Sequence, residues 1–336
     1  MPDLPALRGI VRSSSPVRPG LARLGARLRG GVVKACAWLP EPIRPRFPEP
    51  DPEDAPEPLP DSILPPELGP EPEEESPPSG PSAVDLALPE IRSRLWGKGH
   101  CLPGGEEEVL RLAALLPLTS ANTLLLVDGG PGGAASAIAT QRGCWISAYE
   151  SEQEHLAEAA PLLRPFGRRI AMDGYVGAVP AFKERGHEHA LALEPLRRGG
   201  DAARFLAAIT AGLKPSGQLV LTEIVLGQQG PGAELLPVWC RAEGRSGPPP
   251  AESAMRAAFK EARLQVHVTE DLGDRQRKQV LAGWARLCAG MAETGRRPSR
   301  AQAAAMVKEA EAWLLRLKLL DLGRIKLRRW HASRLQ

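Results

Sequence analysis

Residues 124–134 read LLLVDGGPGGA, and this stretch decides the fold of the chain. An apolar run that ends in an aspartate and several glycines is typical of a buried strand that turns directly into a helix. Glycines at such a turn let the backbone approach a ligand closely, and the start of the helix offers N–H groups without intrahelical partners. Glycine-rich turns also serve packing alone, so this stretch by itself leaves nucleotide binding and packing equally open.

Strands and helices alternate on both sides of this turn. Apolar residues at helical spacing predict a helix at 106–116 before it, and Thr123–Val127 reads as a short buried strand. Beyond the turn the pattern predicts a helix at 133–141, a strand at 144–149, a helix at 152–163, strands at 169–172 and 189–193, a helix at 202–213 and a strand at 218–225. This alternation predicts right-handed βαβ units and a parallel sheet.

The C-terminal part continues the pattern and adds a helical insertion. It is predicted to contain a loop rich in glycine and proline at 227–250, a helix at 251–262, a strand at 264–268, long helices at 276–292 and 299–320, and a half-exposed strand at 324–331. We therefore predict an α/β fold with a Rossmann-like, mostly parallel sheet of seven strands, helices on both faces and an antiparallel last strand. The helical insertion spans about 275–322, and the return strand spans 324–332.

The N-terminal part differs in composition from the rest of the chain. Of the 35 prolines, 21 lie within the first 90 residues, residues 1–38 carry seven Lys/Arg against one acid, and residues 47–91 carry no base. We interpret the chain as a basic arm at 1–38, a Pro/Glu-rich linker at 39–84 and a folded domain at 85–336. The linker cannot bury enough apolar surface to fold, so we expect it to be disordered.

Three interpretations of the basic arm stay open. Its arginines stand among leucines, valines and Trp38, so the arm could make weak peripheral contact with a membrane surface. A solvated, mostly disordered tail is the interpretation that we prefer. The Arg-rich, acid-poor composition also suits an organelle transit peptide.

The five cysteines, at 36, 101, 144, 240 and 288, are widely spaced and include no CxxC pair. Neither a disulfide framework nor a metal site is predicted from this spacing. No apolar run is long enough to span a bilayer, and no secretory signal is predicted. These features favour a reducing compartment, and we expect a cytoplasmic location.

Three of the predicted strands end in an acid. Asp128 follows the first strand, Glu150 and Ser151 follow the second, and Asp173 and Gly174 follow the third. Nucleotide-binding folds of this type use a carboxylate after the second strand to accept hydrogen bonds from the ribose hydroxyls. We therefore expect one crevice at the carboxyl ends of these strands.

At this point the sequence resembles the class I S-adenosylmethionine-dependent methyltransferases. The turn at 128–132, DGGPG, is similar to the Asp/Glu-x-Gly-x-Gly turn of that family, and the stretch at 213–221, LKPSGQLVL, is similar to its Leu-Lys-Pro-Gly-Gly turn before the fifth strand. The helical pair followed by the last strand resembles the end of the same fold. The resemblance implies S-adenosylmethionine as the cofactor. The residues implied to bind it are Asp128, Gly129, Gly130, Gly132, Glu150, Ser151, Asp173 and Gly174.

Two registers of the glycine-rich turn are open. In the register that we prefer, Asp128 is the acid of the family motif, because the apolar strand then ends directly before it. In the other register the acid falls on Leu126, and Asp128 takes the place of the first glycine. A carboxylate at that glycine would crowd the donor, which keeps a catalytically degraded domain open.

The resemblance extends to small-molecule N-methyltransferases of the phosphoethanolamine or sarcosine type. Residues 96–100, WGKGH, resemble the segment that lies over the methyl donor in those enzymes, which makes His100 a candidate catalytic residue. Glu194 ends the fourth strand and is our other candidate: it could contact the acceptor as a base or as the partner of a cationic amine. A salt bridge at the surface is an equally good interpretation of Glu194.

Methyl transfer to a small molecule, such as an amine, is therefore the predicted function. The alternative is a binding or scaffold protein that keeps the fold without turnover. Residues 275–336 hold 15 Lys/Arg against four acids, but the helices there need their apolar stripes for packing, so nucleic acid is not favoured as a partner. A nicotinamide-dependent oxidoreductase is less favoured, because it does not explain the Leu-Lys-Pro stretch or the helical insertion.

Overall fold

The computed structural model describes residues 81–175, 181–230 and 232–336. The predicted basic arm and nearly all of the predicted linker lie outside these residues. The helix that begins at Ala83 is capped by the Ser82 hydroxyl, which accepts a hydrogen bond from the Asp85 N–H. Ser82 and Asp85 form a capping box, so the first described helix begins at Ala83, close to the predicted start of the folded domain at residue 85.

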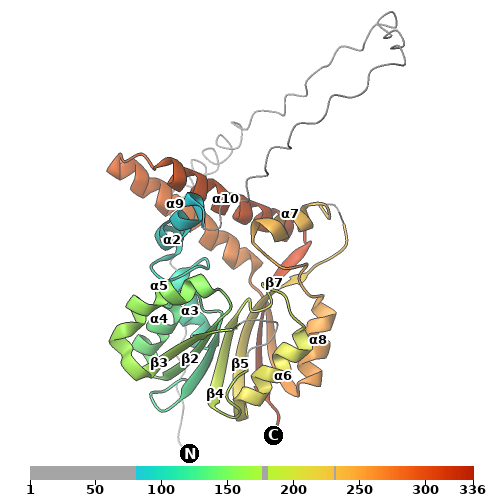
Figure 1. The fold of residues 1–336 in the computed structure, drawn as a ribbon. Coiled ribbons are helices and arrows are strands. Elements are labelled where there is room, and N and C mark those ends of the chain that lie inside the picture. Colours follow the sequence, from blue (N-terminus) through green and yellow to red (C-terminus); the bar gives the residue numbers. More distant parts are fainter. Residues whose placement is uncertain (1–80, 176–180, 231) are drawn as a thin grey trace, which may run out of the picture. The chain divides into compact units, whose positions relative to one another are not determined.

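Seven strands form one sheet in the order β3-β2-β1-β4-β5-β7-β6 (Figure 1). All neighbouring pairs from β3 to β5 are parallel, and β7 lies antiparallel between β5 and β6. The strands are β1 (Thr123–Val127), β2 (Trp145–Glu150), β3 (Ile170–Gly174), β4 (His187–Leu193), β5 (Leu213–Leu226), β6 (Leu264–Asp271) and β7 (Ile325–Arg334). The predicted Rossmann-like α/β fold is confirmed.

Helices cover both faces of the sheet. On one face lie α3 (Gly105–Ala113), α4 (Gly133–Arg142), α5 (Gln153–Leu163) and the 3-10 turn η1 (Arg164–Arg169), and on the other lie α6 (Ala202–Gly212) and α8 (Glu252–Glu261) (Figure 1). Along β1, Leu124 and Leu126 pack into the first core, whereas Leu125 and Val127 pack into the second. This double burial explains why the strand is apolar at every position from 124 to 127.

A separate layer of helices lies at the carboxyl ends of the parallel strands (Figure 1). It contains α2 (Ala83–Trp96), α9 (Gly273–Thr294) and α10 (Arg300–Asp321), whose apolar residues form a third core, and α7 (Leu235–Ala242), which packs against α10. Trp96 and Trp313 meet edge to face at the centre of this core, with ring centroids 5.4 Å apart. Among the described residues no helix is long and apolar enough to cross a bilayer.

Sequence reasoning missed α2 and α7. The sequence was interpreted as linker up to residue 84, and Pro89 interrupts the helical spacing of the buried residues of α2, which are Leu88, Ile91, Leu95 and Trp96. The predicted loop at 227–250 contains α7, whose Trp239 is fully buried. In both cases nearby prolines and glycines concealed an apolar stripe that tertiary packing uses.

The insertion of β7 between β5 and β6 generates a test of the fold. Trp330 on β7 is 1% exposed and packs against Phe259 of α8 with ring centroids 5.6 Å apart. Trp330→Ala is expected to lower the free energy of unfolding by about 3–5 kcal/mol, because it leaves a large cavity in the second core. Trp145→Ala is the matched control, because Trp145 is 46% exposed; we expect it to cost about 1 kcal/mol or less. Chemical denaturation checks both, and equal costs would contradict this role of β7.

Candidate functional site

The site lies where the order of the strands reverses. The chain proceeds outward from β1 to β2 and β3 on one side, and from β4 to β5 on the other, so β1 and β4 flank a topological switch point. Ligands of open α/β sheets bind outside the carboxyl ends of the strands at this point. The glycine-rich turn after β1 and the segment that follows β4 therefore border the candidate site.

The glycine-rich turn packs closely against the segment at 99–101. The Gly133 N–H donates to the Gly99 carbonyl at 2.9 Å, so the first N–H of α4 is already paired. A Cβ added at Gly130 would lie 2.7 Å from the Cys101 Sγ, and one at Gly133 would lie 2.5 Å from the Gly99 carbonyl oxygen. Glycine is thus required at both positions for contact with this segment, and the packing explanation of the turn is observed directly.

Asp128 adopts a backbone conformation that favours glycine. Its φ is 52°, in the left-handed region that aspartate tolerates better than most residues. One carboxylate oxygen accepts a hydrogen bond from the Ser151 N–H at 2.9 Å, and the other is 2.6 Å from the Tyr175 hydroxyl. This conformation fits the register in which Asp128 takes the place of the first glycine, rather than the register that we preferred.

The Asp128 carboxyl is shielded from solvent and lies near a second acid, Glu150. Burial, together with the nearby Glu150 carboxylate, raises the pKa of Asp128 to about 8, although its hydrogen bonds with Tyr175 and Ser151 oppose the shift. The folded protein therefore binds a proton at this carboxyl more tightly than the unfolded chain does. The contacts of this carboxyl with Ser151 and Tyr175 link the end of β1 to the residues that follow β2 and β3.

Glu150 joins the second strand to the turn. Its side chain is buried, and one carboxylate oxygen accepts the Gly130 N–H at 2.8 Å. The other oxygen lies 3.3 Å from the His155 Nδ1. His155 is buried as well; burial lowers its pKa, but the hydrogen bond and charge of Glu150 outweigh this effect and raise it. The carboxylate predicted at the end of β2 thus contacts the glycine-rich turn with one oxygen. Its other oxygen lies next to His155.

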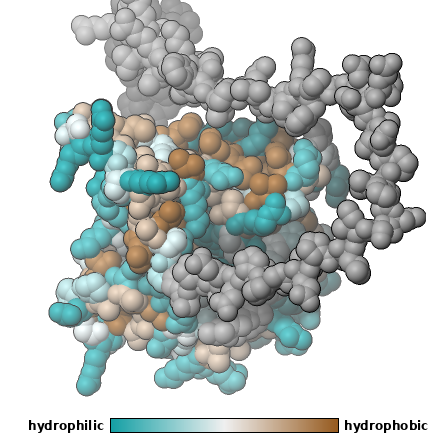
Figure 2. All heavy atoms as spheres, turned by 45° about the horizontal axis from the view of Figure 1, so that its top comes forward, coloured by the Kyte–Doolittle hydropathy of each residue, from teal (hydrophilic) through white to brown (hydrophobic). Residues whose placement is uncertain are grey.

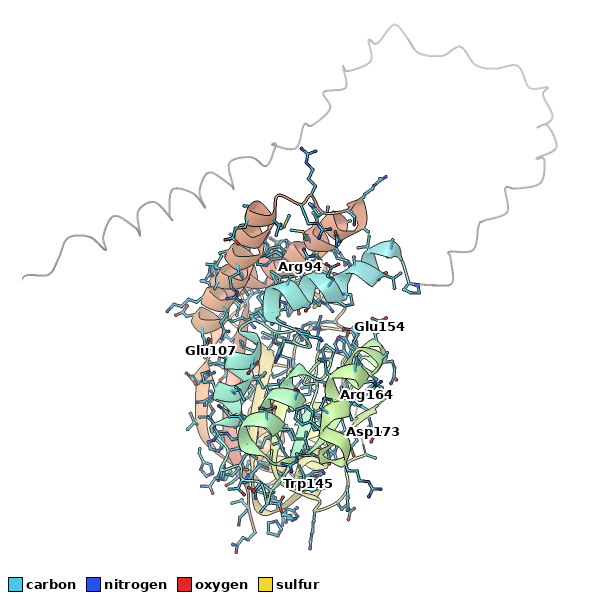
Figure 3. All side chains as sticks on the ribbon, turned by 90° about the vertical axis from the view of Figure 1, so that its left-hand side faces the viewer. Arg94, Glu107, Trp145, Glu154, Arg164 and Asp173 are labelled. Atoms are coloured by element: carbon cyan, nitrogen blue, oxygen red, sulfur yellow. The ribbon has the colours of Figure 1, made fainter. Side chains whose placement is uncertain are left out.

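The remaining residues predicted to bind the donor are placed differently. Ser151 contributes its backbone N–H to Asp128. Asp173 and Gly174 end β3 and are exposed, and neither forms a hydrogen bond with the turn. In Figure 3 Asp173 lies on the same side of the molecule as Glu154, whereas Trp145 marks the opposite ends of the strands. The structure brings together Asp128, the glycines, Glu150 and Ser151; Asp173 and Gly174 pair with Tyr149 and Glu150 across the sheet but do not contact the turn through hydrogen bonds.

A cleft of about 880 Å³ opens beside this turn. Pro131 of the turn, Glu152 after β2 and Arg197 after β4 line it, and Arg92 and Lys308 of the helical layer contribute to its wall. A volume of this size suits a small molecule or cofactor. The cleft therefore combines the ends of the strands at the switch point with residues of α2 and α10.

His100 also lines this cleft. Its side chain is 7% exposed, and burial lowers its pKa, so the ring is neutral near pH 7. A neutral imidazole is able to accept a proton. The nearby Cys101 thiol is different, because burial and the Glu150 charge raise its pKa to about 12. The cleft thus holds a candidate base but no activated thiol at this position.

The walls of the cleft carry cations that lack carboxylate partners. Within the described part of the chain, Lys98, Arg197 and Arg241 form no ion pair, although Arg197 donates to the Glu243 carbonyl at 2.8 Å. Glu152, in contrast, is paired with Arg198 at 3.2 Å. The same residues include no group of three or more His, Cys, Asp or Glu side chains that could hold a metal ion. The lining suits a polar or charged ligand.

Glu194 lies in a buried ion network behind the cleft. Its oxygens accept hydrogen bonds from Arg316 at 2.8 and 2.6 Å and from Arg245 at 2.9 Å. Glu243 pairs with the same two arginines, and Glu223 completes the network. Glu194 is 4% exposed, so the salt bridge that was the alternative interpretation exists but is internal rather than at the surface. In this structure its carboxylate has no free oxygen facing the cleft.

The network holds one more carboxyl than it has guanidinium groups. Its three carboxylates come from β4, β5 and the segment after α7, and its two guanidinium groups come from Arg245 and Arg316. Burial raises the pKa of Glu223 to about 7; Arg245 opposes this shift and Glu194 adds to it. Both Glu223 oxygens accept backbone N–H groups, from Leu196 and Ile224, at 2.8 Å. The acid at the carboxyl end of β4 is therefore part of a buried network that stabilises the fold.

Sequence reasoning missed Tyr175, His155 and Arg197. Tyr175 lies two residues after the third strand-end acid, and His155 stands near the start of a predicted helix, so position alone did not distinguish them from surface residues. The available signal was proximity to strand ends, because residues just after parallel strands meet at one edge of the sheet. Arg197 follows Glu194 by three residues and carried the same signal.

Comparison with known proteins supports the fold. A phosphoethanolamine N-methyltransferase from Haemonchus contortus, solved with S-adenosyl-L-methionine, superposes with a TM-score of 0.65 at 15% identity, covering 76% of this chain and 58% of that one. A putative sarcosine dimethylglycine methyltransferase from Galdieria sulphuraria gives 0.55 at 13% identity, covering 68% and 85%. The chain has the fold of the S-adenosylmethionine-dependent methyltransferases.

The similarity to these proteins concerns the fold and does not by itself establish the reaction. The [4+2]-cyclase SpnF superposes with a TM-score of 0.56 at 18% identity, covering 75% of this chain and 93% of that one. This methyltransferase fold therefore occurs in a protein described by a different reaction. The chain spans less than two thirds of the Haemonchus contortus enzyme. No family model and no curated protein matches the sequence.

The raised pKa of Asp128 generates a prediction for stability. An unfolded aspartate ionises near its ordinary pKa of 3.8, so between about pH 4 and pH 8 the folded state holds a proton that the unfolded state has released. The folded protein consequently loses stability as the pH rises through this window. Asp128→Asn cannot ionise, so its stability relative to the wild type should rise by up to about 1 kcal/mol per pH unit.

Urea denaturation at pH 5, 6, 7 and 8 measures this difference. Asp173→Asn is the matched control, because Asp173 lies at the end of β3 but is exposed. Its stability relative to the wild type should stay nearly constant over the same range. Parallel pH dependences of Asp128→Asn and the wild type would show that the Asp128 carboxyl is already ionised in the folded protein.

The ion network generates a second prediction. Arg316→Ala should lower the free energy of unfolding by about 3–5 kcal/mol, because it leaves Glu194 and Glu243 buried without their main partner. Arg256→Ala removes an exposed pair with Glu252 and should cost less than about 1 kcal/mol. Guanidinium denaturation of both variants compares the two costs. A cost for Arg316→Ala as small as that of the control would refute the structural role of the network.

Proposed function

We propose that this protein transfers a methyl group from S-adenosylmethionine to a polar small molecule. The observation that carries the proposal is the cleft of about 880 Å³ at the switch point of the sheet, beside the glycine-rich turn and its carboxylate partner Glu150. The likeness to solved methyltransferases supports it at the level of the fold. An amine is one acceptor that suits this lining, and so is an anionic molecule.

The residues around the turn fit the methyl donor in their chemistry. Glu150 would be the carboxylate for the ribose hydroxyls, and the turn that it holds at Gly130 carries Pro131, which lines the cleft. Asp128 and the Ser151 N–H complete this edge. The segment at 99–101 lies against the turn, so we expect it to move aside when the donor enters.

When bound, S-adenosylmethionine supplies a methyl group on a sulfonium, and the acceptor lone pair displaces a neutral thioether. The protein has to orient the two molecules and exclude water, and it needs no nucleophile of its own. An anionic acceptor in the cleft is bound and oriented by Lys98, Arg197 and Arg241. His100, neutral and at the edge of the cleft, takes the proton that an amine acceptor releases.

The alternative function is a binding or scaffold protein without turnover. It is favoured by the placement of Asp128, whose side chain occupies a glycine-like position and bridges Ser151 and Tyr175. This carboxyl would crowd a donor that lies along the turn. Asp128→Gly separates the two functions: the crowded site should gain affinity for the donor, whereas an Asp128 that binds the donor should lose it.

Calorimetric titration with S-adenosylmethionine and S-adenosylhomocysteine tests the proposal. Glu150→Ala should weaken donor binding by about 1–3 kcal/mol, the usual cost of removing a charged hydrogen-bond partner from a buried site. Glu107→Ala is the control, because Glu107 is exposed on α3, away from the turn (Figure 3). Melting temperatures of both variants show whether the fold is kept.

The outcomes of these titrations distinguish methyl transfer from the scaffold function. Donor binding by the wild type that Glu150→Ala weakens and Glu107→Ala does not would support the donor site. Binding that is independent of Glu150 would move the ribose site elsewhere. No binding of either compound by the wild type or by Asp128→Gly would refute methyl transfer and leave the scaffold function.

A further inference from the structure

A second cavity lies on the other side of α2. It has a volume of about 710 Å³ and is formed by α2, the end of α9 and the start of α10. Residues 90, 91 and 94 of α2 line it, whereas residues 85, 88, 89, 92 and 93 line the cleft described above. At 100° per residue these two sets lie on opposite faces of the helix. We call this second cavity the α2–α9 groove.

The floor of the α2–α9 groove is apolar. Ile91 is 1% exposed and Leu287 is 5% exposed, and both belong to the core of the helical layer. Met291 and Met306 are partly buried beside them. Methionine side chains adapt to the shape of an apolar ligand at little cost. A hydrocarbon chain that enters the groove would therefore pack mainly against Met291 and Met306, because Ile91 and Leu287 are already almost fully buried.

The rim of the groove is basic. Arg94, Arg286, Arg296 and Arg297 line it, against the single acid Glu90. Glu90 is paired with Arg94, and Arg286 donates to the Leu95 carbonyl. Within the described ranges Arg286, Arg296 and Arg297 have no carboxylate partner. The helical layer faces the viewer in Figure 2, where hydrophobic and hydrophilic side chains adjoin one another.

We propose that the α2–α9 groove binds a single-chain amphiphile with an anionic headgroup. The apolar floor takes the chain, and the arginines of the rim take the carboxylate or phosphate, a group that guanidinium binds through two hydrogen bonds. A small anion would leave the floor wet, and a neutral lipid would leave three guanidinium groups without a partner. The buried floor is reached by a chain that enters the groove rather than by a flat bilayer surface. A volume of this size fits one such molecule.

The proposal goes beyond methyl transfer and does not depend on it. The groove shares none of its lining residues with the cleft, so binding of an amphiphile and binding of the methyl donor are measured separately. Failure of one leaves the other untouched.

Calorimetric titration of the full chain with sodium oleate, kept below its aggregation concentration, tests the proposal. Oleate should bind, whereas acetate, which has the charge alone, and oleyl alcohol, which has the chain alone, should bind much more weakly. Arg296→Ala/Arg297→Ala should weaken oleate binding by roughly tenfold or more. The matched control, Arg164→Ala/Arg168→Ala, removes two exposed arginines near η1 and should leave it unchanged.

A variant of the floor separates the groove from general surface charge. Met306→Glu places a negative charge beside the expected path of the chain and should abolish oleate binding while the melting temperature stays close to that of the wild type. Oleate binding that survives this variant or the double arginine variant would overturn the proposal. So would equal binding of acetate, or binding to vesicles of anionic phospholipid without binding of free oleate, which would assign the surface to a membrane.

Discussion

The bidentate pair between Arg316 and Glu194 ties the two parts of the described fold together. Arg316 lies on α10 in the helical insertion, and Glu194 ends β4 at the switch point of the sheet. Both side chains are buried, and Trp239 and Trp313 flank the guanidinium. Paired charges are tolerated in such a place only when all partners are present, so the network fixes the orientation of the helical layer relative to the sheet. The position of the cleft, which both parts line, follows from this constraint.

This arrangement changes what the end of β4 can do. In an open α/β sheet the strand ends at the switch point are free to contact a ligand. Here the Glu194 backbone has a φ of 53°, and its oxygens are used by two arginines. The polar groups that face the cleft come instead from the next turn of chain, around Arg197, and from the segment at 98–100. Chemistry at this site therefore depends on residues beside the strand ends rather than on the strand-end acid itself.

The fold could be predicted from the sequence because its signals are local. The apolar run of β1, the glycines after it and the strand–helix rhythm each follow from backbone physics within about ten residues. The site was predicted only in part. Glu150 and the glycines come together as expected, whereas the partners of Glu194 lie 51 and 122 residues away, and no local pattern reveals such pairs. The conformation of Asp128 could not be predicted either, because the sequence of the turn is compatible with both registers.

The position of α2 explains why the helical layer matters to the cleft. Its C-terminal end is anchored by Leu95 and Trp96, which are almost fully buried. Its N-terminal half packs Val84, Ala87 and Leu88 on the third core and adds the exposed pair of Asp85 with Lys308. Exposed pairs of this kind contribute little to stability, whereas the aromatic anchor contributes much. Because opposite faces of α2 line the cleft and the α2–α9 groove, a substitution that displaces this helix would alter the shape of both.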